Sequence, residues 1–484
     1  MSEIPLHKLK EGQWGIVKSV PEGYTGISPG SAVRCLYRSP LKDPTAYQVD
    51  GTVIALRKAD CDEVMAETEE EADAPSPESE TGIDSCCRLD RLLTHPVTAF
   101  PIMLLLLMGV FWLTIRGANY PSELLSKLLF SLEQPFYHLL RDGAGLPIFF
   151  CEMIACGMYR VLAWVIAVIL PPMAIFFPLF TILEDWGLLP RVAFNLDRCF
   201  RCCGTCGKQA LTLCMGFGCN ASAVMESRII ESRRDRLIAM ITNSLVPCNG
   251  RFPILICIIT MFFSRMFPAF MLTAMILTAV AATFLLTKIL SLTLLRGGRS
   301  SFSLEIPPFC RPRFGKVILT SILERTALVL ARALAAAAPA GLVIYLLANI
   351  TVGDGSILSA ASSFLDPAGR AIGLDGVILL AFILGLPANE IVLPAMMMIY
   401  MKEGMLTEVT DLEFFRMLLL ENGWTPLTAF NVLLFSLMHW PCAATILTIR
   451  KESGSWGWTL VSVLAPLVMG VTLCGITAAI SCKI

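Results

Sequence analysis

The sequence predicts an all-α polytopic membrane protein, with about eight to ten transmembrane helices, preceded by a small all-β domain. Three observations predict this class. Of the 484 residues, 55% are hydrophobic and 16% are charged, whereas soluble proteins carry about 25% charged residues. Apolar stretches of about 20 residues recur from Phe100 onward, and each is long enough to cross a bilayer. Short β-rich runs fill the N-terminal region.

Residues 1–65 are predicted to form a small SH3-like barrel. The β-rich runs of this region are separated by the turn signals "PEGYTG", "SPGS", "LKDP" and "DG". The runs are "GQWGIVKSV", "SAVRCLYRS", "TAYQVD" and "TVIALRKA". No catalytic grouping of side chains is visible in them, so we expect an interaction or regulatory module.

Residues 66–88 are predicted to be a disordered linker. This segment is acidic, rich in Pro and Ser, and without apolar periodicity, so it cannot bury enough surface to fold. The membrane domain then extends over residues 89–484.

The membrane domain contains eight long apolar segments. They lie at about 98–115, 146–183, 237–263, 268–295, 317–350, 373–402, 425–449 and 457–481. Basic residues gather between spans, notably from Arg198 to Arg236 and from Arg296 to Lys316. The positive-inside rule places these segments, and the N-terminal domain, in the cytoplasm, but leaves the orientation of the last three spans open. Because the arginines lie between membrane spans, no nucleic-acid binding is expected.

Two short segments resemble each other and interrupt apolar runs. "GFGCN" (216–220) and "GLPAN" (385–389) both have Gly first and Asn fifth, and a Pro-Cys pair follows downstream of each, at Cys248 and Cys442. Breaking signals at corresponding places in two halves predict two gate repeats with broken helices around a site near the bilayer midplane. The alternative is chance similarity, because Gly and Pro are frequent in membrane helices.

The broken segments carry candidate metal ligands. Thiolates and carboxylates together suit a first-row divalent metal, and an acidic residue within a membrane span indicates function by default. The candidates are Cys219, Cys248 and Cys442, the adjoining Asn220 and Glu390, and Glu184 and Asp185 at the end of a span. For any single cysteine the alternative is a small packing residue.

A separate cluster of four cysteines lies in "CFRCCGTC". The offsets of 3, 4 and 7 would place Cys199, Cys202, Cys203 and Cys206 on one face of a helix. Alternatively, two back-to-back C-x-x-C units in a loop would chelate metal through two or three thiolates. The third interpretation is a reduced cluster without metal, because the cytoplasm keeps thiols reduced.

The order of motifs from residue 89 onward resembles the membrane core of FeoB-type ferrous-iron transporters. The matching segments include "LEDWGLLPRVAFNLDR", "GFGCNASAVMESRIIESRRDRL", "SLVPCNGRFPI", "IPPFCRPRFGKVI", "LGLPANEIVLPAM", "GWTPLTAFNVLLF" and "PCAATILTIRKESGSWGWTLVSV". The N-terminal domain resembles FeoA, a small SH3-like cytoplasmic partner, through "RSPLKDPTAYQVDGTVIALRKADCDEV".

The resemblance implies uptake of Fe(2+), as the transported ion, across the bacterial inner membrane through two gate regions. It makes Cys219 and Cys248 the first candidates for the metal pathway, followed by Cys442, Glu184, Asp185 and Glu390. The expected partners are ferrous iron, membrane lipid, a separate G protein and further copies of the chain in a homo-oligomer.

The chain departs from the family in two informative ways. FeoB proteins usually begin with a GTP-binding domain, but no G-x-x-x-x-G-K-[ST] phosphate loop occurs here, so we expect no nucleotide on this chain. Transport would then rely on a separate G protein or on the iron gradient. Asn389 stands where the family commonly has lysine, which would alter gating or cation selectivity.

Three other functions compete with ferrous-iron transport. The first is a non-conducting regulatory or scaffold paralogue. The second is a transporter of another divalent metal such as manganese or zinc, and the third is a transporter of another solute such as a nucleoside. An enzyme is the weakest alternative, because the four histidines accompany no nucleophile–base pair and no H-E-x-x-H motif.

Overall fold

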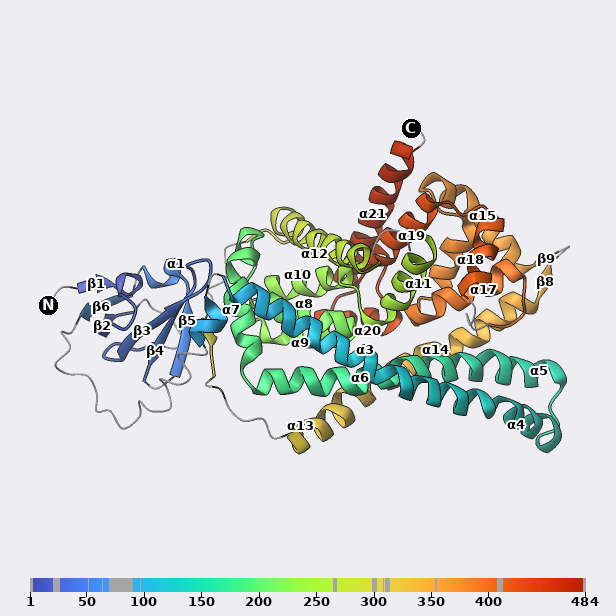
Figure 1. Cartoon of the computed structure of the whole chain (residues 1–484), viewed down its shortest axis with the longest axis horizontal. Coiled ribbons are helices and arrows are strands. Elements are labelled where there is room, and N and C mark those ends of the chain that lie inside the picture. The colour runs from blue at the N-terminus through green and yellow to red at the C-terminus, as the bar shows by residue number, and fades with distance from the viewer. Residues whose placement is uncertain are drawn as a thin grey trace.

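The computed structural model places a small β-rich domain at one end of a long helical body (Figure 1). It describes residues 3–20, 27–50, 52–62, 64–68, 90–95, 97–263, 268–297, 303–307, 309, 314–352, 355–406 and 412–481. The expected linker lies almost entirely outside the described residues.

The N-terminal domain is an antiparallel sheet with the strand order β1-β6-β2-β3-β4-β5-β7. Its inward side chains alternate with outward ones, as the period-2 pattern of the sequence requires. The strands are β1 (Glu3–Pro5), β2 (Trp14–Ser19), β3 (Ala32–Arg38), β4 (Thr45–Val49), β5 (Thr52–Leu56), β6 (Met65–Thr68) and β7 (Ser303–Glu305). The all-β prediction is confirmed, and β6 continues three residues beyond the boundary expected at 65.

The last strand of this sheet comes from the membrane domain. In β7, Leu304 is the register partner of Ala55 in β5, and the Ile306 N–H donates to the Val53 carbonyl at 2.8 Å. Residues 303–305 therefore close one edge of the N-terminal sheet. The sequence analysis missed this contact, because three residues carry no recognisable strand pattern.

The membrane domain is helical. Its α-helices are α3 (Ala99–Ser131), α4 (Glu133–His138), α5 (Ile148–Glu152), α6 (Arg160–Asp185), α7 (Leu188–Cys202), α8 (Gln209–Gly218), α9 (Asn220–Glu226), α10 (Arg233–Thr242), α11 (Phe252–Phe262), α12 (Pro268–Leu292), α13 (Phe314–Thr320), α14 (Ala327–Asn349), α15 (Ile357–Ala371), α16 (Gly376–Leu384), α17 (Val392–Met401), α18 (Leu412–Glu421), α19 (Pro426–Met438), α20 (Ala443–Ser453) and α21 (Trp456–Ser481). Short pieces are α1 (Lys58–Cys61), the 3₁₀ helices η1 (Leu6–Lys8), η6 (Ser227–Ile229), η7 (Asn243–Leu245), η8 (Asn249–Arg251) and η10 (Asn389–Ile391), the π-helices η4 (Leu139–Gly143), η5 (Met153–Tyr159) and η9 (Ser321–Thr326), and a two-stranded ribbon of β8 (Thr351–Val352) and β9 (Gly355–Ser356).

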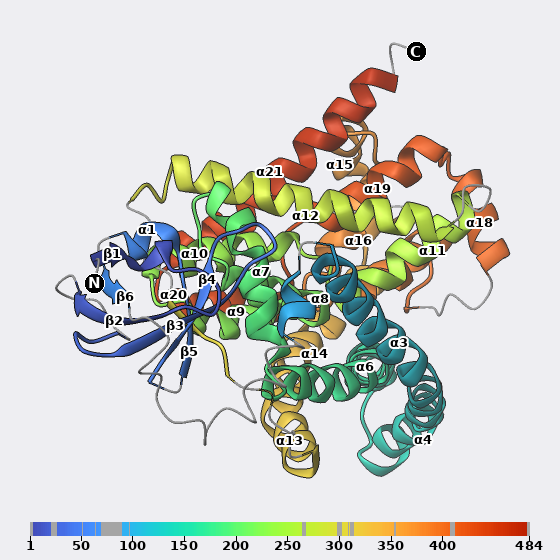
Figure 2. The ribbon, with the colours of Figure 1, turned by 60° about the vertical axis from the view of Figure 1, so that its left-hand side comes forward.

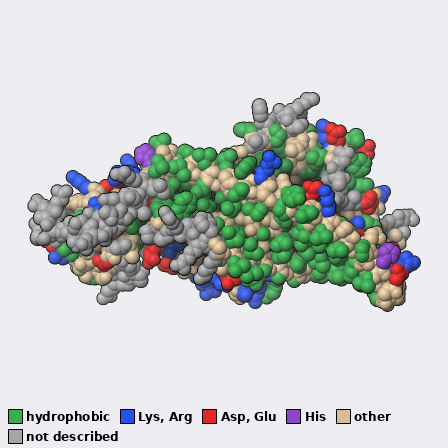
Figure 3. All heavy atoms as spheres, turned by 60° about the horizontal axis from the view of Figure 1, so that its bottom comes forward, with side chains coloured by type: hydrophobic (Ala, Val, Ile, Leu, Met, Phe, Trp, Pro, Cys, Tyr) green, Lys and Arg blue, Asp and Glu red, His purple; other side chains and the backbone are tan. Residues whose placement is uncertain are grey.

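Within the described residues, seven helical stretches are long and apolar enough to cross a membrane, or eight if the bent pair α15–α16 counts as one. This agrees with the lower end of the expected eight to ten. Figure 3 shows a broad hydrophobic band over one face of the helical body, with most of the charged side chains toward its rims. A bilayer covers such a band.

Within the helical body, two runs of elements follow the same order. The first copy runs η5, α6, α7, α8, α9, α10, α11 and α12, and the second runs η9, α14, α15, α16, α17, α19, α20 and α21. In both, a π-helix leads into the first long helix. Figures 1 and 2 show α7 beside the N-terminal domain and α15 far from it, so the two copies run in opposite directions. Such inverted repeats are typical of secondary transporters.

The copies match residue by residue around the first break. Residues 196–220 align with residues 365–389 without a gap. The shared residues are Leu196 and Leu365, Asp197 and Asp366, Arg201 and Arg370, Gly204 and Gly373, Gly207 and Gly376, Leu211 and Leu380, Gly216 and Gly385, and Asn220 and Asn389. Gly204 and Gly373 both end a helix with positive φ, at 89° and 70°. The similarity therefore extends well beyond the five residues recognised in the sequence.

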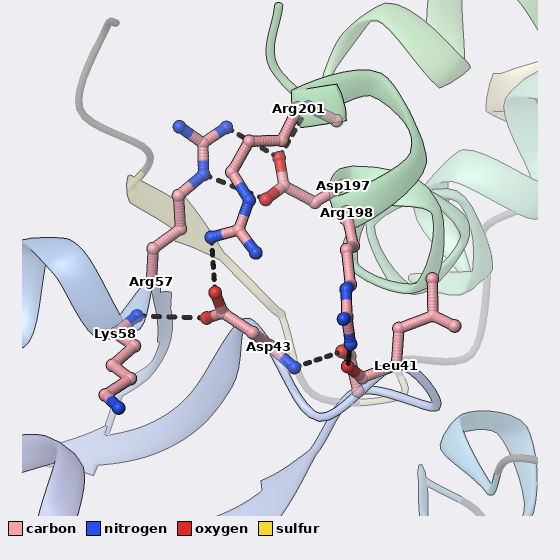
Figure 4. A network of polar contacts seen from close by, with 9 residues as sticks. Leu41, Asp43, Arg57, Lys58, Asp197, Arg198 and Arg201 are labelled. Carbon is pink, nitrogen blue, oxygen red and sulfur yellow. Dashed lines mark hydrogen bonds and ion pairs between the residues drawn. The ribbon is translucent and has the colours of Figure 1, made fainter. Parts of the chain in front are cut away.

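The N-terminal domain docks on α7 through polar and aromatic contacts (Figure 4). Arg57 after β5 forms a buried, two-pronged ion pair with Asp197 of α7. Arg201 pairs with Asp43, and the Tyr37 and Phe194 rings meet edge to face at 5.8 Å. These contacts hold the N-terminal domain against α7 of the membrane domain.

Candidate functional site

Four interruptions of the helical backbone meet in the helical body. Cys219, between α8 and α9, has extended φ and ψ of −151° and 119°, and Ala388, at the corresponding position, has −152° and 124°. The two Pro-Cys pairs are also extended, with φ and ψ of −80° and 169° at Cys248 and −64° and 159° at Cys442. The expected helix breaks are therefore present at all four places. Non-helical backbone at this depth is tolerated where protein or a cavity surrounds it.

Three candidate thiols are close together at these breaks. Cys219, Cys248 and Cys442 lie within electrostatic range of one another, and Glu390 lies within range of the latter two. Cys219 and Cys248 are each 8% exposed. The structure thus brings together four residues that are distant in sequence and that the sequence analysis named as metal ligands.

Arg251, which the sequence analysis missed, ties two of the breaks together. It is completely buried three residues after Cys248, and its guanidinium donates to the carbonyls of Ser244, at 2.8 Å, and Leu437, at 2.9 Å. It also reaches the His439 carbonyl at 3.4 Å. These carbonyls are freed because η7 and α19 end before the Pro-Cys pairs. A charged residue inside the apolar run "LVPCNGRFPI" was the available signal.

The Cys248 break also contacts the start of the second copy's broken segment. The Asn389 amide donates to Cys248 Sγ at 3.7 Å, and its oxygen lies 3.3 Å from His439 Nε2. The Glu390 carboxylate lies directly against Gly250, where a Cβ atom would come within 2.4 Å of it. The carbonyl of Leu386 accepts from the Ala443 N–H at 2.7 Å, which joins "GLPAN" to "PCAAT".

Asn220 fixes the first break to the end of α10. The Asn243 amide donates to the backbone carbonyl of Asn220 at 3.2 Å. With its own amide nitrogen turned toward them, Asn220 donates to the carbonyls of Gly216 and Asn243. Asn220 therefore holds the backbone around the break. None of these contacts involves the three thiols.

Glu184 and Asp185 lie in a second group, apart from the thiols. Arg325 of η9 lies 3.5 Å from Glu184 and 4.0 Å from Glu226 at the end of α9. Asp185 is exposed at the end of α6. The sequence analysis missed Glu226, although it lies within the quoted motif "GFGCNASAVMESRI".

The cysteine cluster at 199–206 is not a four-thiol helix face. Helix α7 ends at Cys202, and Gly204 takes φ of 89°, so the chain turns before Cys206. Cys202 is exposed, whereas Cys206 is buried, and burial raises the pKa of the Cys206 thiol to about 11. The helical interpretation is therefore wrong; the two-thiolate site and the metal-free cluster stay predictions.

Among the described residues, no three His, Cys, Asp or Glu side chains are arranged to hold a metal ion together. The three thiols at the breaks therefore form no closed cage in this conformation.

Two families of known sequences match the chain. The Gate family, described as nucleoside recognition, matches residues 166–263 and again residues 258–456. The second match begins within α11 and includes α12, so it starts before the second copy does. The FeoA domain family matches residues 4–68, which are the described sheet without β7.

Curated relatives cover most of the chain. The "Fe(2+) transporter FeoB" of Staphylococcus aureus (strain MSSA476) is 27% identical over 398 residues, which are 80% of this chain and 58% of the relative. The protein of the same name from Synechocystis sp. (strain ATCC 27184 / PCC 6803 / Kazusa) is 26% identical over 92% of this chain and 70% of the relative. A "Fe(2+) transport protein A/Fe(2+) transporter FeoB fusion protein" of Porphyromonas gingivalis (strain ATCC BAA-308 / W83) is 24% identical over 78% of this chain and 49% of the relative.

The chain thus spans little more than half the length of the staphylococcal relatives that it matches. The Gate matches together nevertheless extend over more than half of this chain, and they lie within the helical body. The chain belongs to the Gate family, as an FeoB-type membrane core with an FeoA-like N-terminal domain.

Proposed function

We propose that this protein carries Fe(2+) across the bacterial inner membrane, through the space between the broken helices of its two copies. The relatives' names support ferrous iron as the transported ion. The observation that carries the proposal is the meeting of Cys219, Cys248 and Cys442 at three helix breaks.

The chemistry of this group suits ferrous iron. Thiolates and a carboxylate are good ligands for first-row divalent metals, and the thiolates are poor ligands for magnesium. The thiols come from both copies, so relative movement of the copies would change the distances between them. In this proposal the ion passes from Cys219 to Cys248 and Cys442, with Glu390 as the oxygen ligand beside them.

We propose that the N-terminal domain faces the cytoplasm. The arginine-rich segment from Arg228 to Arg236 contacts the α7–α8 region that also carries this domain, through the Arg234 guanidinium and the Gly204 carbonyl at 2.8 Å. The positive-inside rule then assigns this end of the body to the cytoplasm. We also propose that transport relies on a separate G protein or on the iron gradient.

The test is ferrous-iron influx into liposomes that contain the purified protein without nucleotide, followed with an internal chelating dye. Cys219→Ser is expected to reduce influx by at least about tenfold, because it removes the soft ligand at the first break. Cys214→Ser, a thiol change five residues earlier in α8, is the matched control and is expected to transport normally. Manganese and zinc, as competing ions, measure the selectivity.

Two outcomes would contradict the proposal. If Cys219→Ser and Cys214→Ser transport equally, the path does not run through the first break. If well-folded protein gives no influx, either alone or with a G protein and GTP, the chain is a non-conducting scaffold.

A further inference from the structure

The turns that lead into α8 and α16 are built in the same way. The Gly207 N–H donates to Asp197 Oδ1 at 2.7 Å, and the Gly376 N–H donates to Asp366 Oδ1 at 3.2 Å. Each aspartate lies ten residues before its glycine, on the preceding helix. Both glycines pack against that helix so closely that a Cβ atom would overlap its backbone. These turns therefore fix the N-terminal ends of α8 and α16, the helices that lead to the breaks.

In the second copy the aspartate takes its cation from its own helix. Arg370, one turn after Asp366 in α15, donates through Nε to Asp366 Oδ2 at 2.7 Å. The Arg370 side chain is 78% exposed. Residues four apart on a helix are neighbours, so this pairing needs no other part of the chain.

In the first copy the N-terminal domain supplies the cation. Arg57 donates to Asp197 through Nε, at 2.8 Å, and through Nη2, at 2.7 Å. Arg201 corresponds to Arg370, but it pairs with Asp43 of the N-terminal domain instead of with the aspartate on its own helix. Figure 4 shows Arg57 and Arg201 crossing the boundary between the domains from opposite sides.

Asp197 needs a cation while the N-terminal domain is docked. Its carboxylate is completely buried, and a buried charge without a partner is strongly destabilising. If Arg57 leaves, Arg201 is the cation within reach, at the same four-residue spacing that Asp366 and Arg370 use. The second copy thus displays the arrangement that the first copy would adopt without its docked domain.

The aspartate turn is connected to the first helix break by two routes. Helix α8 runs directly from this turn to Cys219. At its start, the Gln209 amide donates to Thr242 Oγ1 at 2.9 Å, at the end of α10, and the next residue, Asn243, holds Asn220. A change in the partner of Asp197 therefore acts on the position of the first break.

We propose that Asp197 exchanges its partner between Arg57 and Arg201, and that this exchange couples docking of the N-terminal domain to the metal pathway. Arg57 is a positioning residue that acts through Asp197 and Gly207. Docking gives Asp197 two strong bonds from outside the membrane domain, and release returns the turn to the self-paired form seen in the second copy.

Hydrogen exchange of the full-length protein, measured by mass spectrometry, tests the exchange of partners. In Arg57→Ala the β5 and β7 amides are expected to exchange at least about tenfold faster, while the Gly207 amide stays within about threefold of wild type, because Arg201 replaces Arg57. In the Arg57→Ala, Arg201→Ala double variant the Gly207 amide is expected to exchange at least about tenfold faster than in Arg57→Ala. Arg201→Ala alone is expected to leave Gly207 protected.

Equal exchange of Gly207 in Arg57→Ala and in the double variant would overturn the proposal, since Arg201 would then contribute nothing after release. Arg57→Lys keeps the charge but loses the two-pronged geometry, and it provides the same comparison at smaller size if Arg57→Ala does not fold. Arg370→Ala is the matched variant of the second copy and should accelerate only Gly376.

The influx readout rests on the transport function proposed above. The double variant is expected to transport at least about fivefold more slowly than Arg57→Ala, which is a typical size for coupling between sites. If wild type shows no influx, either alone or with a G protein and GTP, the transport function fails while the exchange data still decide the partner swap. If influx is intact in the double variant although Gly207 is unprotected, the coupling to the pathway is refuted.

Discussion

The two inverted copies have the same backbone at their first break but different chemistry. Cys219 and Ala388 adopt the same extended conformation, and each is followed by an asparagine. Only the first copy has a thiol there; the second has Glu390 two residues later. The comparison shows that shared glycines, aspartates and asparagines set the path of the chain. Single substitutions at the break then determine which metal ligands each copy contributes.

The copies differ most in how the Pro-Cys break is supported, and removing Arg251 is expected to have the largest effect. The corresponding residue of the second copy is Thr445, whose hydroxyl lies 3.2 Å from Cys442 Sγ. Arg251→Met leaves several buried carbonyls without a donor, so we expect a loss of about 3–5 kcal/mol in stability, read as a lower thermal unfolding temperature in detergent. Arg370→Met, at an exposed site, is the control. A change of less than about 1 kcal/mol for Arg251→Met would show that the carbonyls find other donors.

The aspartate turns should be equally intolerant of bulk in both copies. A Cβ atom would lie 2.5 Å from the Ala193 carbonyl oxygen in Gly207→Ala and 1.9 Å from the Ser362 carbonyl oxygen in Gly376→Ala. Each variant is expected to lose about 1–3 kcal/mol, with the larger loss for Gly376→Ala. Gly475→Ala in α21, where nothing lies within 4 Å of the added methyl, is the control for helix propensity. Unchanged unfolding temperatures in both turn variants would mean that α7 and α15 move away freely.

Adding the missing thiol would make the breaks alike. Ala388→Cys is a small change at a buried position, so we expect it to cost less than about 1.5 kcal/mol in stability. A fourth thiol should bind iron more tightly and slow its release, which lowers maximal influx in liposomes. Ile383→Cys, the position that corresponds to Cys214, is the matched control on α16. Faster influx in Ala388→Cys would indicate that binding, and not release, limits transport.

The smallest effect concerns the turn that follows α7. Burial holds the pKa of the Cys206 thiol at about 11, above its ordinary value, so almost no thiolate forms at neutral pH. Maleimide should label exposed Cys202 within minutes and leave Cys206 unmodified between pH 7 and pH 9, as peptide mapping by mass spectrometry can determine. The second copy has Ala371 and Asp375 at these places, so it supplies no competing thiol. Labelling of Cys206 at the rate of Cys202 would show that the turn opens.

The sequence predicted the elements whose signals are local. Alternation and turn residues identified the N-terminal sheet, and Gly and Pro identified the helix breaks. Only the five-residue segments and the Pro-Cys pairs of the repeat were recognised, because its remaining shared residues occur singly between unrelated ones. An internal alignment at constant spacing would have found Asp197 and Asp366.

Other features depend on contacts between distant segments. The role of Arg251 depends on carbonyls from another helix, and β7 becomes a strand only because β5 offers it an edge. The helix-face interpretation of the cysteine cluster remained open because spacing alone does not reveal that Gly204 ends α7. Such tertiary effects override local preference.

Strand β7 also sets the order in which the newly made chain can mature. Strand β5 ends at Leu56, but its partner begins at Ser303, about 250 residues later, which corresponds to roughly 12–50 s of synthesis at 5–20 residues per second. Until then the edge of β5 presents unpaired N–H and C=O groups, which invite pairing with other chains. The FeoA-like domain is therefore completed only after the first helical copy has been synthesised. A truncated product that stops before Ser303 would carry this open edge, and cellular quality control can recognise it as unfinished.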